Sequence, residues 1–409
     1  MRVAIFSGAH QVPDSFAAKS EYLLDRCGGN TGNFAIISSL YWHLSAMAEQ
    51  VDIVPWEVPV DRVKNGYDLV VFACANMLGI HTDLGGIAAK LELIGLPIIA
   101  IGLGAQADDL TKDIELSPGT RRWVDVLAAH APSRHANIGV RGKYTLGQLD
   151  RLRLGERAIV TGCPSNFISP DPNLASKLKQ AWKAPSANRI AVAAGLPYWP
   201  ELLGLERQLL KMVEQTNGIY IGQHDIDMIR ICRDEFEDIP KDRFEHIHRY
   251  LAPEKSEQAF KQFCRKYAVC FIGAGSWMEA IRKFDFVVGA RFHGIMLALQ
   301  AGVPGAVITH DSRTQELCQT LAIPSKHYSA IKGPLNEKNV RDVFEFDEQA
   351  YARTRSSLSA AYIGILEGAG LTASAPLKAI RAAAPNIVAG ADRRQDPVIA
   401  RTGAPLLAS

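Results

Sequence analysis

Short apolar runs alternate with helical patterns along most of this chain, and this alternation restricts its fold more than any other feature. In the first half the runs are VAIFSG, VDIVP, DLVVFA and PIIAIGLG, and the helical patterns between them are clearest over residues 33–50 and 120–129. Strands that alternate with helices form parallel sheets, because a crossover helix returns the chain to the end where the next strand starts. We therefore predict an α/β fold with parallel sheets.

The alternation stops once, near KAPSANR at residues 183–189, where Pro, Ser and Asn cluster, and then restarts with RIAVAAG, GIYIGQ, AVCFIG, DFVVGA and GAVITH. A chain of 409 residues is long for one core and typical of two. We predict an N-terminal lobe over residues 1–182 and a C-terminal lobe over residues 189–335. Helices over residues 336–370 are expected to pack back across the lobes, and residues 374–409 to form a loosely ordered tail.

Composition and charge limit the kind of partner. The chain is 47% hydrophobic and 22% charged, and its formal net charge is only +2. No general attraction to nucleic acid is expected at that charge, so any anion site must be local. Seven cysteines without a CxxC pair suit a reducing compartment. The start, MRVAIFSGAH, has the pattern of a strand and not of a signal peptide, so we expect a cytoplasmic protein.

The stretch DFVVGARFHGIMLALQAGVP, residues 285–304, places Arg291 and His293 where a buried strand passes into a helix. Parallel α/β sheets bind ligands at the carboxyl ends of their strands. The N–H groups and the dipole of a helix N-terminus favour an anion there. For an isolated Arg-x-His, pairing of Arg291 with a carboxylate and capping of the helix by His293 are equally consistent with the sequence.

Two further arginines follow apolar runs. Arg141 lies in NIGVRGKYT, and Arg313 lies in VITHDSRTQEL three residues after His310. Three arginines at three strand ends are harder to explain as separate structural ion pairs than one. If Arg141, Arg291 and Arg313 converge, the ligand is a small molecule that carries phosphate or carboxylate.

Other strand ends carry weaker signals. GGNTGNFAI opens a helix with Asn30 and Asn33 but has neither nucleotide-binding fingerprint, and helix capping explains Asn30 equally well. Ser276 in FIGAGSWME belongs to a candidate anion nest, and Gln223 ends the strand GIYIG. We predict that these residues line the same cleft as the arginines.

Two other motifs suggest chemistry that the sequence does not support. His246 and His248 have HxH spacing but no third ligand nearby, so no metal site is predicted. Cys163 in TGCPSN has no histidine close to it in the sequence, so we expect a small buried thiol and not a nucleophile.

VVGARFHGIMLALQAGVP, GNTGN, IGLGAQ, GVRGKYT and TGCPSNF together resemble the polysaccharide pyruvyl transferase family over residues 20–325. The resemblance implies two Rossmann-like lobes of the GT-B glycosyltransferase type with the site in the cleft between them. It also implies transfer of the enolpyruvyl unit of phosphoenolpyruvate to two hydroxyls of one sugar. Arg141 matches the arginine that the family associates with phosphoenolpyruvate, and His293 matches the histidine of its RxHG motif. Arg313 stands where the family often has lysine, and Asn33 where an acidic residue is common.

Ketal formation from phosphoenolpyruvate starts with protonation of its methylene carbon, and a sugar hydroxyl then attacks the oxocarbenium-like centre. Phosphate and carboxylate suit Arg141, Arg291 and Arg313, so no metal or cofactor is required. His293 is the best acid or base, although an imidazolium that binds phosphate fits equally well.

We expect the donor phosphate on the C-terminal lobe and a sugar or lipid-linked saccharide acceptor on the N-terminal lobe. A membrane-bound acceptor would bring transient contact with the membrane. Two alternatives stay open: a GT-B glycosyltransferase that uses a nucleotide sugar, and a non-catalytic relative that binds an anion or a sugar.

Overall fold

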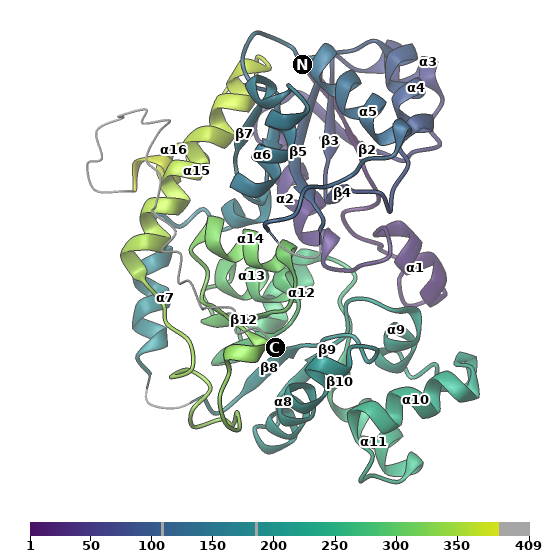
Figure 1. Ribbon diagram of the computed structural model, residues 1–409, viewed down its shortest axis with the longest axis vertical. Coiled ribbons are helices and arrows are strands. Elements are labelled where there is room, and N and C mark those ends of the chain that lie inside the picture. The colour runs from purple at the N-terminus through teal and green to yellow at the C-terminus, as the bar shows by residue number, and fades with distance from the viewer. Residues whose placement is uncertain (108–109, 185–186, 384–409) are drawn as a thin grey trace, which may run out of the picture.

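Two sheets of parallel strands, one in each lobe, form the framework of the protein (Figure 1). The computed structural model describes residues 1–107, 110–184 and 187–383. In sheet order, the N-terminal strands are β2 (Gln50–Val54), β1 (Arg2–Phe6), β3 (Leu69–Ala73), β5 (Ile98–Ala105), β6 (Ile138–Val140) and β7 (Ala158–Val160), with β4 (Asn76–Leu78) beside β5. The C-terminal strands are β10 (Ala268–Val269), β9 (Ile219–Ile221), β8 (Ile190–Ala193), β11 (Phe286–Gly289), β12 (Gly305–Thr309) and β13 (Ser325–His327).

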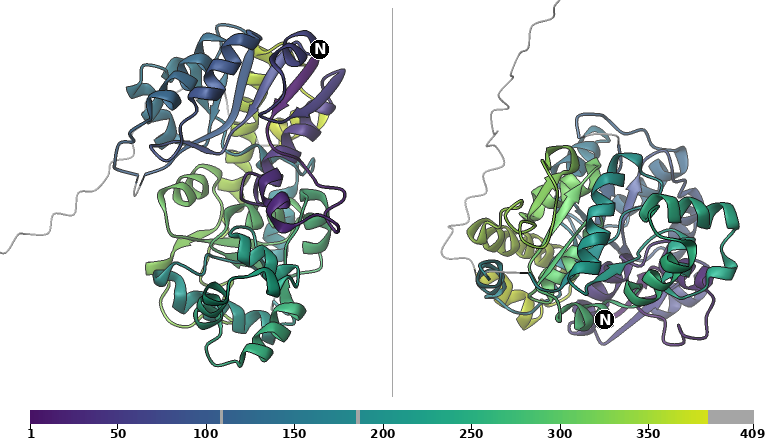
Figure 2. Two further views of the ribbon diagram at one scale, coloured as in Figure 1. Left: turned by 90° about the vertical axis from the view of Figure 1, so that its right-hand side faces the viewer. Right: turned by 90° about the horizontal axis from the view of Figure 1, so that it is seen from below.

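Helices connect the strands, and the two lobes lie one above the other (Figure 2). The N-terminal part contains α1 (Ser20–Arg26), α2 (Asn33–Ser45), α3 (Val60–Gly66), α4 (Gly85–Ile94), α5 (Pro118–Ala129), α6 (Lys143–Arg151) and α7 (Leu174–Trp182). The C-terminal part contains α8 (Leu203–Gln215), α9 (Ile226–Cys232), α10 (Lys241–Leu251), α11 (Glu257–Tyr267), α12 (Ala274–Ile281), α13 (Phe292–Gln300) and α14 (Ser312–Leu321). Two last helices are α15 (Glu348–Gly368) and α16 (Ala375–Ala382). The predicted fold class, two parallel α/β lobes, is confirmed.

Successive residues of the strands enter different cores, because side chains of a strand alternate between its two faces. In β1, Val3 and Ile5 pack into a cluster that continues through α2 and α13 into the other lobe. Ala4 and Phe6 pack on the opposite face with α4 and α5. Burial on both faces explains why these strands read as continuous apolar runs and not as alternating ones.

The strand orders place a topological switch in each sheet. When its strands are numbered in chain order, the C-terminal sheet has the order 3-2-1-4-5-6. The second and third strands extend the sheet to one side of β8 and the last three extend it to the other side, so the switch lies between β8 and β11. In the N-terminal sheet the change falls between β1 and β3. Open parallel sheets bind ligands outside the carboxyl ends of the strands at such a switch. Residues after β3 and after β11 are therefore the first places to look for a site.

Helix α15 returns the chain to the N-terminal sheet. It contacts α7, β6 and β7, and it also contacts α14 of the C-terminal lobe. Its buried Arg355 donates hydrogen bonds to three carbonyl oxygens, those of Asn166 at 3.0 Å, Asp171 at 2.9 Å and Ser169 at 2.5 Å. Figure 1 shows α15 running alongside the N-terminal lobe, with its lower end reaching the C-terminal lobe near α14.

Two details of the sequence prediction are wrong. The helix predicted over residues 33–50 ends at Ser45, because the chain turns and Gln50 already pairs with Arg2 at the start of β2. Part of the predicted loose tail is helix α16, which is held by buried Leu377 and Ile380. The rest of that tail, from residue 384, lies outside the described residues. Within the described residues, no helix has the length and hydrophobicity needed to cross a membrane.

Candidate active site

A small cavity of about 100 Å³ lies between the lobes, at the carboxyl ends of strands from both sheets. Eight of the nine residues predicted from the sequence line it: Asn30, Asn33, Arg141, Gln223, Arg291, His293, His310 and Arg313. The rest of its lining consists of Ala75, Asn76, Ala290, Phe292, Asp311, Thr314 and Leu317. Three guanidinium groups therefore face one carboxylate, and the excess of positive charge favours an anionic ligand.

Arg141 follows β6 and is fixed by the N-terminal lobe. Its Nε donates to the carbonyl oxygen of Gly102 at 2.9 Å, and its Nη1 donates to Oδ1 of Asn76 at 2.5 Å. The side chain is only 4% exposed, and this burial lowers the pKa of Arg141 from its usual value. No carboxylate is paired with it among the described residues, so its charge is available to a ligand.

Arg291 follows β11 at the N-cap of α13, on the β8–β11 switch. Its Nε and Nη2 are buried and have no hydrogen-bond partner among the described residues. The guanidinium lies 5.1 Å from the centre of the Trp199 ring, which adds a cation–π contact. Burial, and then the nearby Arg313, lower the pKa of Arg291 to about 10, so it remains charged at neutral pH. A buried cation with two unpaired donors is a strong indication of an anion site.

Arg313 comes from the first turn of α14, and Asp311 at the N-cap of that helix holds it in place. Arg313 donates from Nε and Nη2 to Oδ2 of Asp311 at 2.8 and 2.5 Å, and from Nη1 to Oε1 of Gln106 at 3.3 Å. Asp311 also accepts from the backbone N–H of Thr314. Burial alone would raise the pKa of Asp311, but Arg313 and His310 outweigh it and the pKa falls below its usual value. Asp311 is therefore ionised.

His310 precedes this pair, and its ring packs against Trp199 with 4.2 Å between ring centres. Both ring nitrogens are buried, and neither makes a hydrogen bond to a described residue. Burial lowers the pKa of His310, so the ring is neutral near pH 7.

His293 lies in the first turn of α13 and touches a cysteine of the other lobe. Its Nε2 lies 3.6 Å from Sγ of Cys163, and that sulfur lies 2.9 Å from Oγ of Ser165. Burial, and then Arg141, lower the pKa of His293 to about 3. Burial also raises the pKa of the Cys163 thiol, so both partners are neutral near pH 7.

The turn before α2 brings the N-terminal lobe against the C-terminal one. Thr31 donates its backbone N–H to the carbonyl oxygen of Gln223 at 2.9 Å, and Asn30 forms an isolated bridge with His224. A Cβ on Gly32 would lie 3.1 Å from Cβ of His293, so only glycine allows this approach without displacement.

The side chains of Asn30 and Asn33 are engaged within the turn, while that of Gln223 is not. Asn30 accepts from the Gly32 backbone N–H at 2.8 Å, and Asn33 donates to the carbonyl oxygen of Cys27 at 2.9 Å. The Nε2 of Gln223 is buried without a partner among the described residues. Gln223 is thus the better ligand contact of the three.

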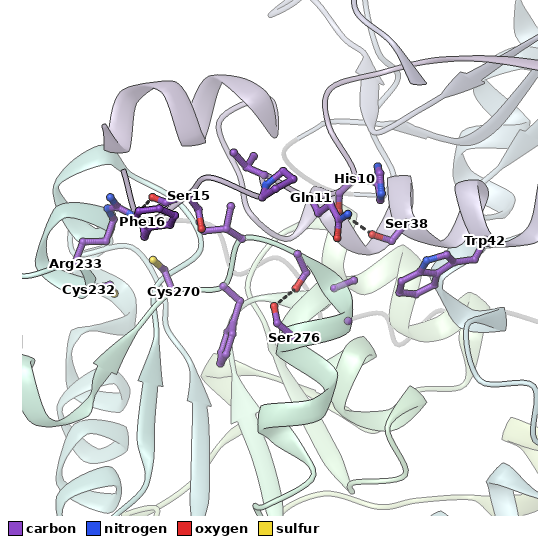
Figure 3. A pocket seen from close by; sticks show the side chains of 17 residues that line it. His10, Gln11, Ser15, Phe16, Ser38, Trp42, Cys232, Arg233, Cys270 and Ser276 are labelled. Carbon is purple, nitrogen blue, oxygen red and sulfur yellow. Dashed lines mark hydrogen bonds between the residues drawn. The ribbon is translucent and has the colours of Figure 1, made fainter. Parts of the chain in front are cut away.

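Ser276 is not part of this cavity, and its prediction as a contact in the same cleft is wrong. It follows β10, at the edge of the C-terminal sheet, and lines a different hollow with Gln11 and Trp42 (Figure 3). The cause is the strand order, since β9 separates β10 from the switch between β8 and β11.

Three residues of the site were not predicted. Asn76 orients Arg141, and Cys163 contacts His293. Glu206 of α8 is buried beside Tyr220, whose hydroxyl donates to it at 2.5 Å. Burial raises the pKa of Glu206, and its carboxyl group acts electrostatically on Arg291. The sequence marks Cys163 only by its place after a strand, and nothing distinguishes Glu206 from a surface residue of a helix.

The other motifs weighed from the sequence have structural partners. The Nε2 atoms of His246 and His248 lie 2.9 and 2.8 Å from the carbonyl oxygens of Pro197 and Lys255, respectively. Each imidazole therefore forms a hydrogen bond with a nearby backbone carbonyl group.

Two parallel α/β lobes with an arginine-rich cavity at their facing strand ends define a two-lobed α/β protein whose interlobe cavity carries an excess of positive charge. The chain belongs to the polysaccharide pyruvyl transferase family, whose model, "Polysaccharide pyruvyl transferase", matches residues 21–312. No curated protein matches the chain.

Several solved structures share the general arrangement at low identity. The Staphylococcus aureus MnaA–UDP structure is 11% identical with a TM-score of 0.41, over 93% of this chain and 94% of that one. Anabaena Alr3699/HepE in complex with UDP is 12% identical with a TM-score of 0.41, over 93% and 98%. UDP-GlcNAc 2-epimerase from Methanocaldococcus jannaschii is 9% identical with a TM-score of 0.41, over 85% and 95%.

Proposed function

We propose that this protein is a phosphoenolpyruvate-dependent pyruvyl transferase that forms a pyruvate ketal on a sugar of a bacterial-type polysaccharide or its lipid-linked precursor. The observation that carries the proposal is Arg291, with two buried donor atoms that no described residue satisfies, facing a cavity shared with Arg141 and Arg313. Membership of the family supplies the reaction class.

The charges of the cavity suit this donor. Phosphoenolpyruvate carries a phosphate and a carboxylate on one small carbon frame, so its two anionic ends need separate cations. Arg141 comes from the N-terminal lobe, whereas Arg291 and Arg313 come from the C-terminal lobe. Guanidinium groups bind both kinds of oxyanion through paired N–H donors. The donor would therefore bridge the lobes, with its phosphate on the C-terminal side.

Two roles are open for His293, that of an acid or base and that of an imidazolium that binds phosphate, and its protonation state decides which one is favoured. With a pKa of about 3 the imidazole is neutral at pH 7, so it is not a ready source of protons. A neutral imidazole can accept the proton of an attacking sugar hydroxyl. A bound phosphate dianion would raise the pKa of His293 and allow it to hold that proton.

The reaction balances without an external co-reactant. A proton adds to the methylene carbon, and the first sugar hydroxyl bonds to the adjacent carbon and gives up its own proton. The C–O bond to phosphate then breaks, and the second hydroxyl bonds to the same carbon as it loses its proton. The products are the cyclic ketal and inorganic phosphate. Of the two protons that the hydroxyls release, one offsets the proton added to carbon and the other leaves on the phosphate as hydrogen phosphate. A histidine beside the donor phosphate can relay a proton between these groups.

Incubation with phosphoenolpyruvate and a panel of nitrophenyl and lipid-linked glycosides tests the proposal. The expected result is acceptor-dependent release of phosphate, together with a sugar whose mass has increased by one pyruvyl ketal. Thermal unfolding in the presence of ligands separates this proposal from a glycosyltransferase. Phosphoenolpyruvate should raise the melting temperature more than nucleoside diphosphates do. Stabilisation by nucleoside diphosphates alone, without phosphate release from phosphoenolpyruvate, would contradict it.

A further inference from the structure

A larger hollow than the arginine cavity lies beside helix α2, where the two lobes meet at β10. Its volume is about 500 Å³, and it lies between the segment 10–16 after β1 and the start of α12. A second hollow of about 410 Å³ continues along α12 as far as Arg282. Trp42 and Gly275 line both hollows. We call the two hollows together the Trp42 trench.

The side chain of Trp42 is more exposed than most other side chains of α2. Most side chains of α2 are buried in the core between the lobes, yet Trp42 is 39% exposed. Figure 3 shows its indole at one end of the first hollow, with Gln11 and Ser276 beside the open space. A Cβ on Gly275 would lie 4.0 Å from Cζ2 of Trp42, so a larger side chain at this position would fill the space beside the indole. An exposed aromatic face between two hollows is a platform for an apolar ring surface.

The polar groups of the trench suit a neutral ligand that is rich in hydroxyls. Ser38 and Ser276 donate to the carbonyl oxygens of His10 and Gly273, at 3.0 and 3.1 Å, and keep acceptor lone pairs. The charged groups that line it are paired, Arg282 with Glu279 at 3.4 Å and Arg233 with Glu235 at 2.6 Å. The trench therefore favours an anionic ligand less than the arginine cavity does.

We propose that the Trp42 trench is a saccharide-binding site, which holds the part of an extended acceptor glycan that is remote from the reacting sugar. Sugars combine an apolar C–H face, which stacks on an indole, with hydroxyl groups around the ring. This inference rests on the proposed function for the identity of the glycan as an acceptor, but not for the binding itself.

The position of the trench sets the length of the ligand. Asn33 at the start of α2 lines the arginine cavity, and Trp42 lies nine residues later in the same helix. At 1.5 Å and 100° per residue, that places Trp42 about 13 Å along the helix and on its opposite side. A monosaccharide cannot reach both places, so a glycan that occupies both must have several sugar units and must pass around α2.

Binding of the full-length protein to an array of bacterial polysaccharide fragments and their constituent monosaccharides, without phosphoenolpyruvate, tests the site. The wild type should bind at least one fragment more tightly than its monosaccharides. Trp42→Ala should weaken that binding roughly tenfold, which corresponds to about 1.4 kcal/mol. Gly275→Leu should do the same by filling the junction of the two hollows, and Trp42→Phe should retain part of the affinity.

Two control variants separate this site from other effects. Leu93→Ala removes another exposed apolar side chain, on α4, and should leave glycan binding unchanged. Ile159→Ala removes an exposed apolar side chain on β7, which lines neither hollow of the trench, and should also retain it. The inference is overturned if the wild type binds no fragment, or if Trp42→Ala binds as tightly as the wild type. Trp42-dependent binding without phosphate release from phosphoenolpyruvate would refute the proposed function and leave this site standing.

Discussion

The Sγ atom of Cys163, from the N-terminal lobe, lies 3.6 Å from Nε2 of His293, from the C-terminal lobe. Because both groups are neutral near pH 7, Nε2 can carry the proton of the ring and donate it in a hydrogen bond to the sulfur, which leaves Nδ1 free to accept a proton. Ser165 lies 2.9 Å from the sulfur and can donate to it in turn. Such a chain would fix the tautomer and the orientation of an imidazole that acts as a base.

The first prediction therefore concerns Cys163. Cys163→Ala should lower kcat by up to about tenfold, since a hydrogen bond of roughly 0.5–1.5 kcal/mol is lost. Cys163→Ser should retain more activity because its hydroxyl oxygen can still accept from Nε2. The ¹⁵N shifts of labelled His293 should show the tautomer preference weakened in the alanine variant. Unchanged shifts and an unchanged pH profile of kcat in Cys163→Ala would show that the contact is only packing.

Removal of His293 should affect chemistry more than donor binding. His293→Ala is expected to bind phosphoenolpyruvate nearly as tightly as the wild type, yet to release phosphate about 10²–10⁴-fold more slowly, the usual worth of a positioned acid–base group. His293→Gln keeps a hydrogen-bond donor without a titrating proton. If glutamine restores most of the rate in single-turnover measurements, the ring positions phosphate and the proton carrier is another group.

Arg313 and Asp311 should behave as a unit. Arg313→Ala leaves the ionised Asp311 unpaired in the cavity, so the loss of donor affinity should exceed the roughly 1.5–3 kcal/mol of one charged hydrogen bond. Adding Asp311→Asn removes the stranded charge and keeps an N-cap for α14. Titration calorimetry with phosphoenolpyruvate should show the double variant binding more tightly than Arg313→Ala. Additive losses would contradict the coupling.

Arg141 should affect the donor from the opposite lobe. Arg141→Ala is expected to weaken phosphoenolpyruvate binding by about 1.5–3 kcal/mol, because a charge-assisted contact is lost. Asn76→Ala, which removes the side-chain partner of Arg141, should give a smaller loss because the bond to Gly102 remains. Circular dichroism controls for folding, and equal affinity in Arg141→Ala and the wild type would exclude this arginine from the donor site.

Acid should destabilise the fold partly through His293. Its pKa is about 3 when folded and about 6.5 in an unfolded chain, so between these values the unfolded state binds more protons. Its contribution to stability is complete above about pH 6.5 and is lost as the pH falls toward 3. Urea unfolding of His293→Gln should therefore show a shallower loss of stability over this range than the wild type. Buried His43, with its pKa lowered by burial to about 4, adds a similar dependence that remains in the variant.

The sequence predicts the parts of the fold that depend on local pattern. The β1 and β11 runs are buried on both faces and read directly as strands, and the arginines after β6, β11 and β12 follow from their places at strand ends. Which strand ends converge depends on strand order, which the sequence does not show. Ser276 was misplaced for that reason, whereas Arg291 lies at the switch itself.

Contacts between distant segments were equally hidden. Cys163 and His293 are 130 residues apart in the chain, so the absence of a nearby histidine gave no information about the contact. The helix α16 was missed because its stretch is short and rich in alanine, with only Leu377 and Ile380 buried.

Helix α14 contributes both a residue of the cavity and a contact between the two lobes. Its first turn carries Arg313 into the cavity, and one turn later Glu316 accepts from the backbone N–H of Thr145 at 2.7 Å and from its hydroxyl at 2.8 Å. Thr145 lies in the first turn of α6, so a carboxylate of one lobe caps a helix of the other. Any widening of the cavity that separates α14 from α6 would therefore uncap α6 and move Arg313 away from the N-terminal lobe in the same movement. If the proposed function holds, an opening that admits a bulky acceptor would also loosen the grip of the site on the donor phosphate, because both depend on the position of α14.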